Sequence, residues 1–251
     1  MADRIAIPGR FNGPPDTAHG GYASAVAAEL FDCSAQVDLR QPPPLERPLL
    51  VHREHDGSAI LRDGDSTVLQ ARAAHLELDV PDPVSLADAE AAAAQCPWLE
   101  RHPFPTCFGC GPERAVGDGM REFPGPVSDR PGVWATPWVP DGSLADDSGA
   151  VRPAFTFAAL DCPSGAGAIE AGGVSLSEHV HVLGRLTGQV LARVSVGEPH
   201  VVMAWPIRAD GRKRYGGVAI FNGDDSLVAL GEALWIALED PGRFKAATPP
   251  A

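Results

Sequence analysis

A carboxylate at the end of an apolar segment is the clearest sign of chemistry in this sequence. The segment V-R-P-A-F-T-F-A-A-L-D-C-P, Val151–Pro163, is apolar from Pro153 to Leu160 and then presents Asp161. A buried carboxylate without a partner costs several kcal/mol or shifts its pKa. Asp161 is therefore a helix cap, a partnered structural group, or an acid or base that acts on a substrate.

A second candidate lies in A-H-G-G-Y-A-S-A-V-A-A-E-L, where His19, Gly20 and Gly21 precede an alanine-rich segment. Free N–H groups at the start of a helix, together with the helix dipole, stabilise negative charge. Glycine lets a ligand approach the backbone closely because it has no Cβ. The alternative is an ordinary loop that enters a helix, and for His19 a structural role is favoured over a catalytic one.

A third candidate is the pair Cys107 and Cys110 in T-C-F-G-C-G-P. A structural zinc ion usually takes four ligands, and no second Cys-x-x-Cys or paired Cys/His element follows at zinc-finger spacing. His102 is near, but one histidine and two cysteines do not complete a tetrahedron, and the βαβ context of a redox motif is absent. The pattern favours a tight loop with packed thiols over a metal or redox site. We expect no metal and no cofactor, and a loop over Cys107–Gly119 that borders the pocket.

The elements that must position these residues repeat along the chain. The segments Asp65–Asp79 and Asp225–Glu239 share five identical positions without gaps. The apolar, β-prone segments Glu46–Gly57 and Glu198–Gly211 precede them, and each ends in a D-G turn. Each half of the chain therefore predicts an antiparallel meander.

A helix of small residues precedes each meander, over Gly21–Phe31 in the first half and from about Ala154 in the second. Such helices suit close burial against a sheet. Between the halves, Pro81–Pro97 predicts a linker helix. We place an N-terminal unit at residues 1–80, the linker helix at 81–102 and a C-terminal unit at 103–251. Outside these elements, Thr106–Pro140 should hold a loop and the first strands of the second half. Asp141–Gly149 should be an exposed acidic loop, and Pro241–Ala251 a frayed tail.

Composition limits the classes of partner. The chain has 251 residues and a net charge of −13, which argues against nucleic acid or an anionic membrane as a partner. No apolar run is long enough to span a bilayer, and the N-terminus lacks the pattern of a signal peptide. The five cysteines are an odd number without the spacing of a disulfide scaffold, which fits a reducing cytoplasm. We expect a cytoplasmic protein with no nucleic-acid or membrane partner.

A helix followed by a meander resembles the hotdog fold, and two such units resemble the double-hotdog acyl-CoA thioesterases. The His-Gly-Gly element resembles that of single-domain hotdog thioesterases of the phenylacetate-pathway type, which carry an Asp nine residues after the His. Here Ala28 stands nine residues after His19, and Glu29 is turned about 100° away on a helix. Nine residues before Asp161 stands Arg152. One half keeps the glycines and the other keeps the acid.

The resemblance implies an α+β double hotdog, with two antiparallel meander sheets each wrapped around a central helix. In that family each active site lies between two subunits. In a fused chain, His19-Gly20-Gly21 would then complement Asp161 in one composite site, and the reciprocal site of Arg152–Ala154 with Ala28 would be inactive. A homo-oligomer of such units is also implied.

The implied activity is hydrolysis of an acyl-CoA or acyl-carrier thioester. Gly21 would donate its N–H to the oxyanion, and Asp161 would act as a general base on water or attack the carbonyl directly. Two alternatives stay open: a non-catalytic protein that binds an acyl group or another hydrophobic ligand, and a hotdog hydratase or dehydratase.

Substrate-binding candidates follow from position and charge. Asn12 is a candidate to direct its amide at the thioester carbonyl. The segment Glu178–Arg185 puts His179 and His181 on one face of a strand, and we expect His179 or a near neighbour to lie opposite the catalytic carboxylate. A basic cluster on a predicted hairpin consists of Arg212, Lys213 and Arg214. It is either a solvated turn or a contact for CoA phosphates.

Overall fold

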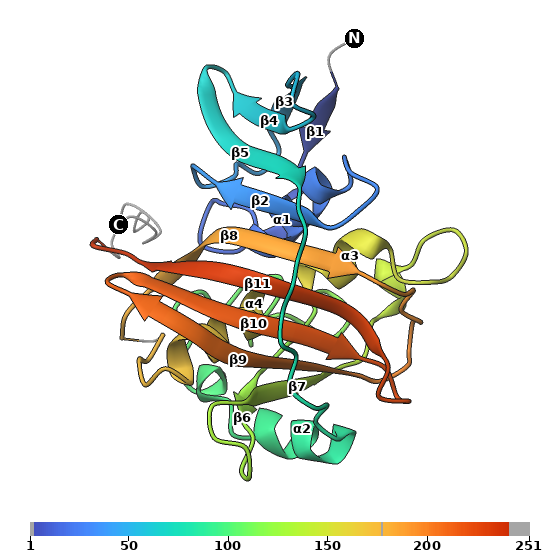
Figure 1. The fold of residues 1–251 in the computed structure, drawn as a ribbon, viewed down its shortest axis with the longest axis vertical. Coiled ribbons are helices and arrows are strands. Elements are labelled where there is room, and N and C mark those ends of the chain that lie inside the picture. The colour runs from blue at the N-terminus through green and yellow to red at the C-terminus, as the bar shows by residue number, and fades with distance from the viewer. Residues whose placement is uncertain (1–2, 177, 241–251) are drawn as a thin grey trace, which may run out of the picture.

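One antiparallel sheet organises the chain in the computed structural model, which describes residues 3–176 and 178–240. The strands of the first half are β1 (Arg4–Ala6), β2 (Ala35–Leu39), β3 (Pro48–Arg53), β4 (Ala59–Asp63) and β5 (Ser66–Ala73). Those of the second half are β6 (Gly125–Pro126), β7 (Trp134–Trp138), β8 (His181–Val190), β9 (His200–Asp210), β10 (Lys213–Phe221) and β11 (Leu227–Ala237). The eleven strands lie in the order β1-β3-β4-β5-β2-β8-β11-β10-β9-β7-β6 (Figure 1).

The helices are short and several begin at recognisable caps. They are α1 (Gly20–Ala28), α2 (Leu86–Ala93), α3 (Pro153–Ala158) and α4 (Asp161–Gly165). Single helical turns are η1 (Gly9–Phe11), η2 (Pro97–Leu99), η3 (Gly142–Leu144) and the π-helical η4 (Ala166–Glu170). The His19 side chain caps α1 by accepting the N–H of Tyr22, and α3 begins with proline, which suits a first helical turn.

The order of the sheet is symmetric about the pair β2–β8. In each half the first strand after the helix (β2 or β8) pairs with the last strand (β5 or β11), which pairs in turn with β4 or β10. The predicted meanders are confirmed as β3–β4–β5 and β9–β10–β11. At the junction of the halves, the Arg185 guanidinium lies 2.7 Å from the Asp38 carboxylate.

The sheet carries α1, α3 and α4 on one face, and the connection between the halves together with α2 on the other (Figure 1). Helix α1 packs against α3, with Gly21 against the Ala158 carbonyl and Tyr22 stacked on Phe155. On the opposite face, Leu78 and Val80 of the connection pack against a cluster that includes Met203. The repeated segment Asp65–Asp79 is therefore not one strand throughout: β5 ends at Ala73, and the chain then crosses the outer face of the sheet toward α2.

The structure confirms the expected linker helix and revises the expected acidic loop. Helix α2 lies inside the predicted linker segment. The acidic loop Asp141–Gly149 is not wholly exposed, because it contains η3 and buries Leu144. The predicted tail, Pro241–Ala251, lies outside the described residues. Within the described residues, no helix combines the length and the apolar character needed to cross a membrane.

Candidate active site

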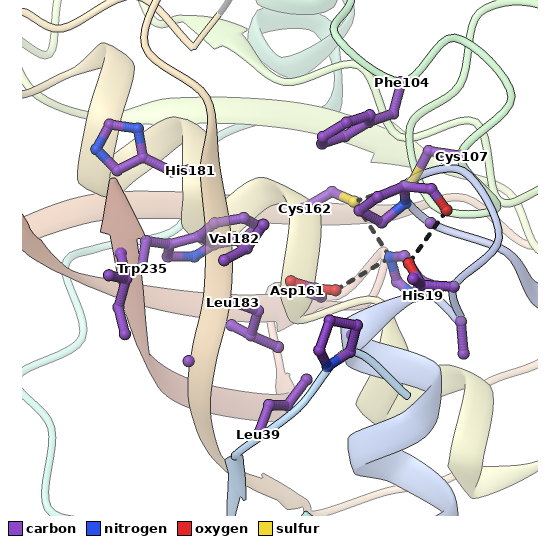
Figure 2. A pocket seen from close by; sticks show the side chains of 18 of the residues that line it. His19, Leu39, Phe104, Cys107, Asp161, Cys162, His181, Val182, Leu183 and Trp235 are labelled. Atoms are coloured by element: carbon purple, nitrogen blue, oxygen red, sulfur yellow. Dashed lines mark hydrogen bonds and ion pairs between the residues drawn. The ribbon is translucent and has the colours of Figure 1, made fainter. Parts of the chain in front are cut away.

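A cavity of about 290 Å³ opens beside the N-terminus of α1. It lies between the start of α1, the segment 102–110, the start of α4 and strands β8 and β11. Apolar side chains form much of its wall, including Leu39, Phe104 and Leu183. Figure 2 shows a polar group of side chains at one side of this cavity, where His19 and Asp161 meet.

Asp161 is held by two donors from the first half of the chain. Its Oδ2 atom accepts the Gly21 N–H at 2.5 Å and lies 3.1 Å from Nε2 of His19. Its Oδ1 atom is buried and has no hydrogen-bond partner within the described residues. Burial raises the pKa of Asp161 to about 6, although the neighbouring His19 opposes this shift. One carboxylate oxygen is thus fixed, and the other is left without a partner.

His19 has a defined tautomer in this network. Its Nδ1 atom accepts the Tyr22 N–H at 3.1 Å, so the hydrogen is assigned to Nε2. That nitrogen faces both Asp161 Oδ2 and, at 3.2 Å, the sulfur of Cys162. Burial lowers the pKa of His19, but the negative charges of Asp161 and Cys107 raise it by more. The imidazole therefore acts as a donor that positions the carboxylate.

The backbone at Gly21 requires glycine because the C-terminal half approaches it so closely. A Cβ atom there would lie 2.5 Å from Cβ of Asp161 and 2.7 Å from the Ala158 carbonyl oxygen. The structure differs from the sequence prediction in one respect. The Gly21 N–H does not face a gap for a thioester carbonyl, since the Asp161 carboxylate occupies it directly. Of the two glycines, Gly20 is the one that lines the cavity.

Two predicted substrate contacts are placed elsewhere. Asn12 donates to the Gly13 carbonyl and to Thr106, both at 3.2 Å, so its amide serves the loop rather than the cavity. His179 is exposed and precedes β8, which begins at His181. The neighbour His181 is buried and lines the cavity instead.

The basic cluster lies on the β9–β10 hairpin, outside the cavity lining. Arg212 reaches the Ala237 carbonyl and the Glu239 carboxylate, both at 3.3 Å. Arg214 pairs in register with Trp235, which does line the cavity. Burial lowers the pKa of His181, and the charge of Arg214 adds to that shift. The hairpin therefore lies beside one wall of the cavity.

Three thiols meet at the polar side of the cavity, although the sequence pattern grouped only two of them. The sulfur atoms of Cys107 and Cys162 are 4.0 Å apart. Hydrogen bonds from Cys110 and Cys162 hold the pKa of the Cys107 thiol well below its usual range. His102 Nε2 lies 3.1 Å from the Cys110 sulfur. Cys162 directly follows Asp161 in the sequence, but no spacing rule connects it to a loop 52 to 55 residues earlier.

Glu122 was missed by sequence reasoning and is fully buried, with an exposed fraction of 0%. Neither carboxyl oxygen has a hydrogen-bond partner within the part of the chain that the structure describes. Burial raises the pKa of Glu122 well above its usual value, and the charges of Asp161 and Cys107 add to this. The residue stands in a Gly/Pro-rich segment that gives no periodic signal of burial.

Replacing Glu122 with methionine should stabilise the protein. The apolar side chain has a similar length and removes two polar atoms without partners, so we expect the free energy of unfolding to rise by about 1–3 kcal/mol. Denaturant unfolding of Glu122→Met beside the wild type measures this. The matched control is the exposed Glu113→Met, which should stay within about 0.5 kcal/mol. A loss of stability in Glu122→Met alone would mean that the carboxyl group has an essential partner.

Comparisons with known proteins identify solved structures that have a similar fold. No protein-family model and no curated protein sequence matches the chain. A proposed thioesterase of Novosphingobium aromaticivorans is similar in structure, with a TM-score of 0.59 and 15% identity over 93% of this chain and 94% of that one. The tesB protein of Mycobacterium avium subs paratuberculosis has a TM-score of 0.56 and 14% identity, over 89% of this chain and 88% of that one. A conserved protein of unknown function with a hot dog fold, from Alicyclobacillus acidocaldarius, has a TM-score of 0.55 and 13% identity, over 94% of this chain and 93% of that one. The chain therefore shares the fold of hotdog proteins, thioesterases among them.

Proposed function

We propose that this chain is a double-hotdog thioester hydrolase with one complete site between its halves. One observation carries the proposal: His19 and Gly21, from the N-terminal half, hold Asp161 of the C-terminal half at the wall of an apolar cavity. The two units would be residues 1–80 and 103–251, joined by the linker 81–102. The symmetric strand order supports a duplicated unit, and the fold shared with thioesterases supports the reaction class.

The unpartnered Oδ1 atom of Asp161 is the reactive oxygen in this proposal. In one route it takes a proton from water, which attacks the thioester carbonyl carbon and expels the thiol. In the other route Oδ1 attacks that carbon itself, the thiolate leaves, and water hydrolyses the resulting mixed anhydride. Both routes need Oδ2 to stay fixed, which the donors Gly21 and His19 provide.

The oxyanion would be stabilised at the start of α1, by a backbone N–H one residue before the Gly21 N–H that the sequence predicted. Because the Gly21 N–H is taken by the carboxylate, we assign the oxyanion contact to the N–H of Gly20, which lines the cavity. This group belongs to the first helical turn, where the backbone N–H groups and the helix dipole favour negative charge.

The reciprocal site is proposed to be inactive. A second cavity, of about 380 Å³, is lined by Ala28, Glu29, Pro153 and Ala154. It has alanine where a catalytic acid would stand and no glycine pair at the helix start. Burial raises the pKa of Glu29, and the neighbouring Arg152 opposes this shift. These features support a single working site per chain.

We propose that the β9–β10 hairpin contacts the phosphates of CoA. Arg212, Lys213 and Arg214 stand beside the cavity wall, and Lys and Arg suit phosphate groups. Replacing all three with alanine should raise KM for an acyl-CoA, by roughly tenfold for each charge-assisted hydrogen bond lost. The control is the same acyl group on a short thiol without phosphates, whose KM should not change. Equal KM changes for both substrates would reject the contact.

The test of the proposed reaction is thiol release from short-chain, long-chain and aryl acyl-CoA substrates. We expect turnover above the uncatalysed rate for at least one class. Tight binding of an acyl-CoA without turnover would identify the alternative, a binding protein, and the occupied Gly21 N–H is the observation that favours it. Addition of water to an enoyl-CoA without thiol release would identify a hydratase.

A further inference from the structure

Three potential metal ligands, His19, Cys107 and Cys162, converge from three distant segments of the chain, and Cys110 hydrogen-bonds to the two other thiols. Cys107 and Cys110 come from the loop before β6, Cys162 from α4, and His19 from the N-cap of α1. The ligand atoms of His19, Cys107 and Cys162 all lie within 4.8 Å of one another. All four side chains are buried, with exposed fractions of 2–5%. The sequence prediction of no metal depended on counting two cysteines and His102, whereas the fold brings Cys162 and His19 to the loop.

The distances suit one small ion. Zinc bonds of about 2.3 Å to sulfur and 2.0–2.1 Å to nitrogen place tetrahedral ligands about 3.8 Å apart for two sulfurs and about 3.5 Å for sulfur and nitrogen. The Cys107 and Cys162 sulfurs are 4.0 Å apart, and His19 Nε2 lies 3.2 Å from the Cys162 sulfur. A disulfide would need the two sulfurs to approach to about 2.05 Å.

The turn between the two loop cysteines is shaped for this convergence. A Cβ atom on Gly109 would lie 2.6 Å from the Cys162 sulfur and 2.7 Å from His19 Nε2. Any other residue would therefore push both groups away from the loop. His102 Nε2, at 3.1 Å from the Cys110 sulfur, is placed to donate to a thiolate, as residues around metal ligands commonly do. Its Nδ1 accepts the Phe104 N–H, which fixes the hydrogen on Nε2.

We propose that Cys107, Cys110, Cys162 and His19 bind one Zn²⁺ ion at the side of the cavity. Soft thiolates with one imidazole form a common set of zinc ligands, and metal binding would displace the thiol protons into solvent. The site ties α1, the loop and α4 together, and it joins the two halves of the chain at the point where the cavity lies.

The four ligands contribute unequally. In the hydrogen-bond network His19 carries its hydrogen on Nε2, so binding requires that hydrogen to move to Nδ1, which then loses the N–H of Tyr22 as a donor. The metal-bound Nε2 also stops donating to Asp161 Oδ2, which the Gly21 N–H then holds. Each cysteine must also give up its thiol proton, but the thiolates then bind zinc as soft, charged ligands. Loss of Cys162 should therefore weaken binding more than loss of His19.

The experiment measures metal on the full chain without substrate, so its outcome is independent of hydrolysis. The protein is stripped with a chelator and titrated with Zn²⁺ and with Co²⁺ as a spectroscopic probe. We expect one equivalent per chain, with sulfur-to-cobalt charge-transfer bands and the intense visible bands of a tetrahedral ion. Cys162→Ser should weaken binding at least about 100-fold. His19→Ala should keep the sulfur bands, shift the visible bands and weaken binding less.

Two cysteines outside the cluster supply matched controls. Cys96→Ser replaces another buried thiol and Cys33→Ser an exposed one, and both variants should bind Co²⁺ like the wild type. Should Cys162→Ser fail to fold, alkylation of the wild type answers the same question. In enough denaturant for these buried thiols to react, Zn²⁺ should slow the alkylation of Cys107, Cys110 and Cys162 relative to the metal-free protein, while the rate at the exposed Cys33 stays the same. Absence of stoichiometric metal in the wild type, equal binding by Cys162→Ser, or no protection by Zn²⁺ would overturn the proposal.

Discussion

Asp161→Asn is expected to lower the rate constant of thiol release at least about 100-fold, with a small change in KM. Asparagine has nearly the same shape, and its amide oxygen can accept the Gly21 N–H in place of Oδ2. Its NH₂ group then stands where Oδ1 stood and cannot take a proton from water or attack a carbonyl. Steady-state kinetics on the best acyl-CoA of the panel measure the effect.

The control separates the loss of a reactive oxygen from the loss of a charge. Asp65→Asn removes an exposed carboxylate at the turn between β4 and β5, and its kinetics should match the wild type. Circular dichroism and thermal unfolding establish that both variants are folded. Equal thiol release by the wild type and Asp161→Asn would show that this carboxylate is not the reacting group, and the proposed site would then be wrong.

The repeated elements were predictable because each has a local signal. Apolar, β-prone runs with turns at Asp210-Gly211 and Asn222-Gly223 mark β9 to β11, alternating apolar residues mark β5, and an alanine-rich run marks α1. The end of β5 was not predictable in this way. The alternation continues through Leu76 and Leu78, yet the chain leaves the sheet after Ala73, because Leu78 finds its apolar contacts on the outer face of the second half. That partner lies more than a hundred residues away in sequence.

The residues of the site were predictable as types, and their contacts were not. The complementary losses in the two halves indicated that the glycines and Asp161 belong together. No pattern shows that the carboxylate reaches the Gly21 amide at 2.5 Å and excludes a substrate from it. Likewise, the strand that was expected to present His179 begins at His181, so a shift of two residues in the start of β8 exchanges an exposed imidazole for one in the cavity wall.

The three thiols illustrate the same limit. A count of spacings finds Cys107 and Cys110, because they share one turn. Cys162 joins them only when α4 folds against the loop, and that contact depends on Gly109 having no side chain. A sequence pattern records neighbours along the chain, whereas this cluster is made by packing between the two halves.

Gly21→Ala should destabilise the protein and abolish most of its activity. The new Cβ would lie 2.5 Å from Cβ of Asp161 and 2.7 Å from the Ala158 carbonyl, so α1 and the segment before α4 must move apart. We expect the free energy of unfolding to fall by about 1–3 kcal/mol, despite the gain of up to about 1 kcal/mol from the helix propensity of alanine. Thiol release should fall as well, since the carboxylate loses its fixed position.

Gly20→Ala separates the packing effect from the catalytic one. Its Cβ would lie 3.0 Å from Leu183 Cδ2, 3.1 Å from Leu183 Cβ and 3.3 Å from Asp161 Oδ2, which are milder contacts than those at Gly21, so stability should fall by less than in Gly21→Ala. The added methyl group would still stand at the cavity wall beside the proposed oxyanion donor, so thiol release should drop. Gly223→Ala, where a Cβ meets no atom of the described residues within 4 Å, should change neither quantity. If Gly21→Ala is as stable and active as Gly223→Ala, the close contact between the halves at Asp161 does not exist, and the composite site loses its physical basis.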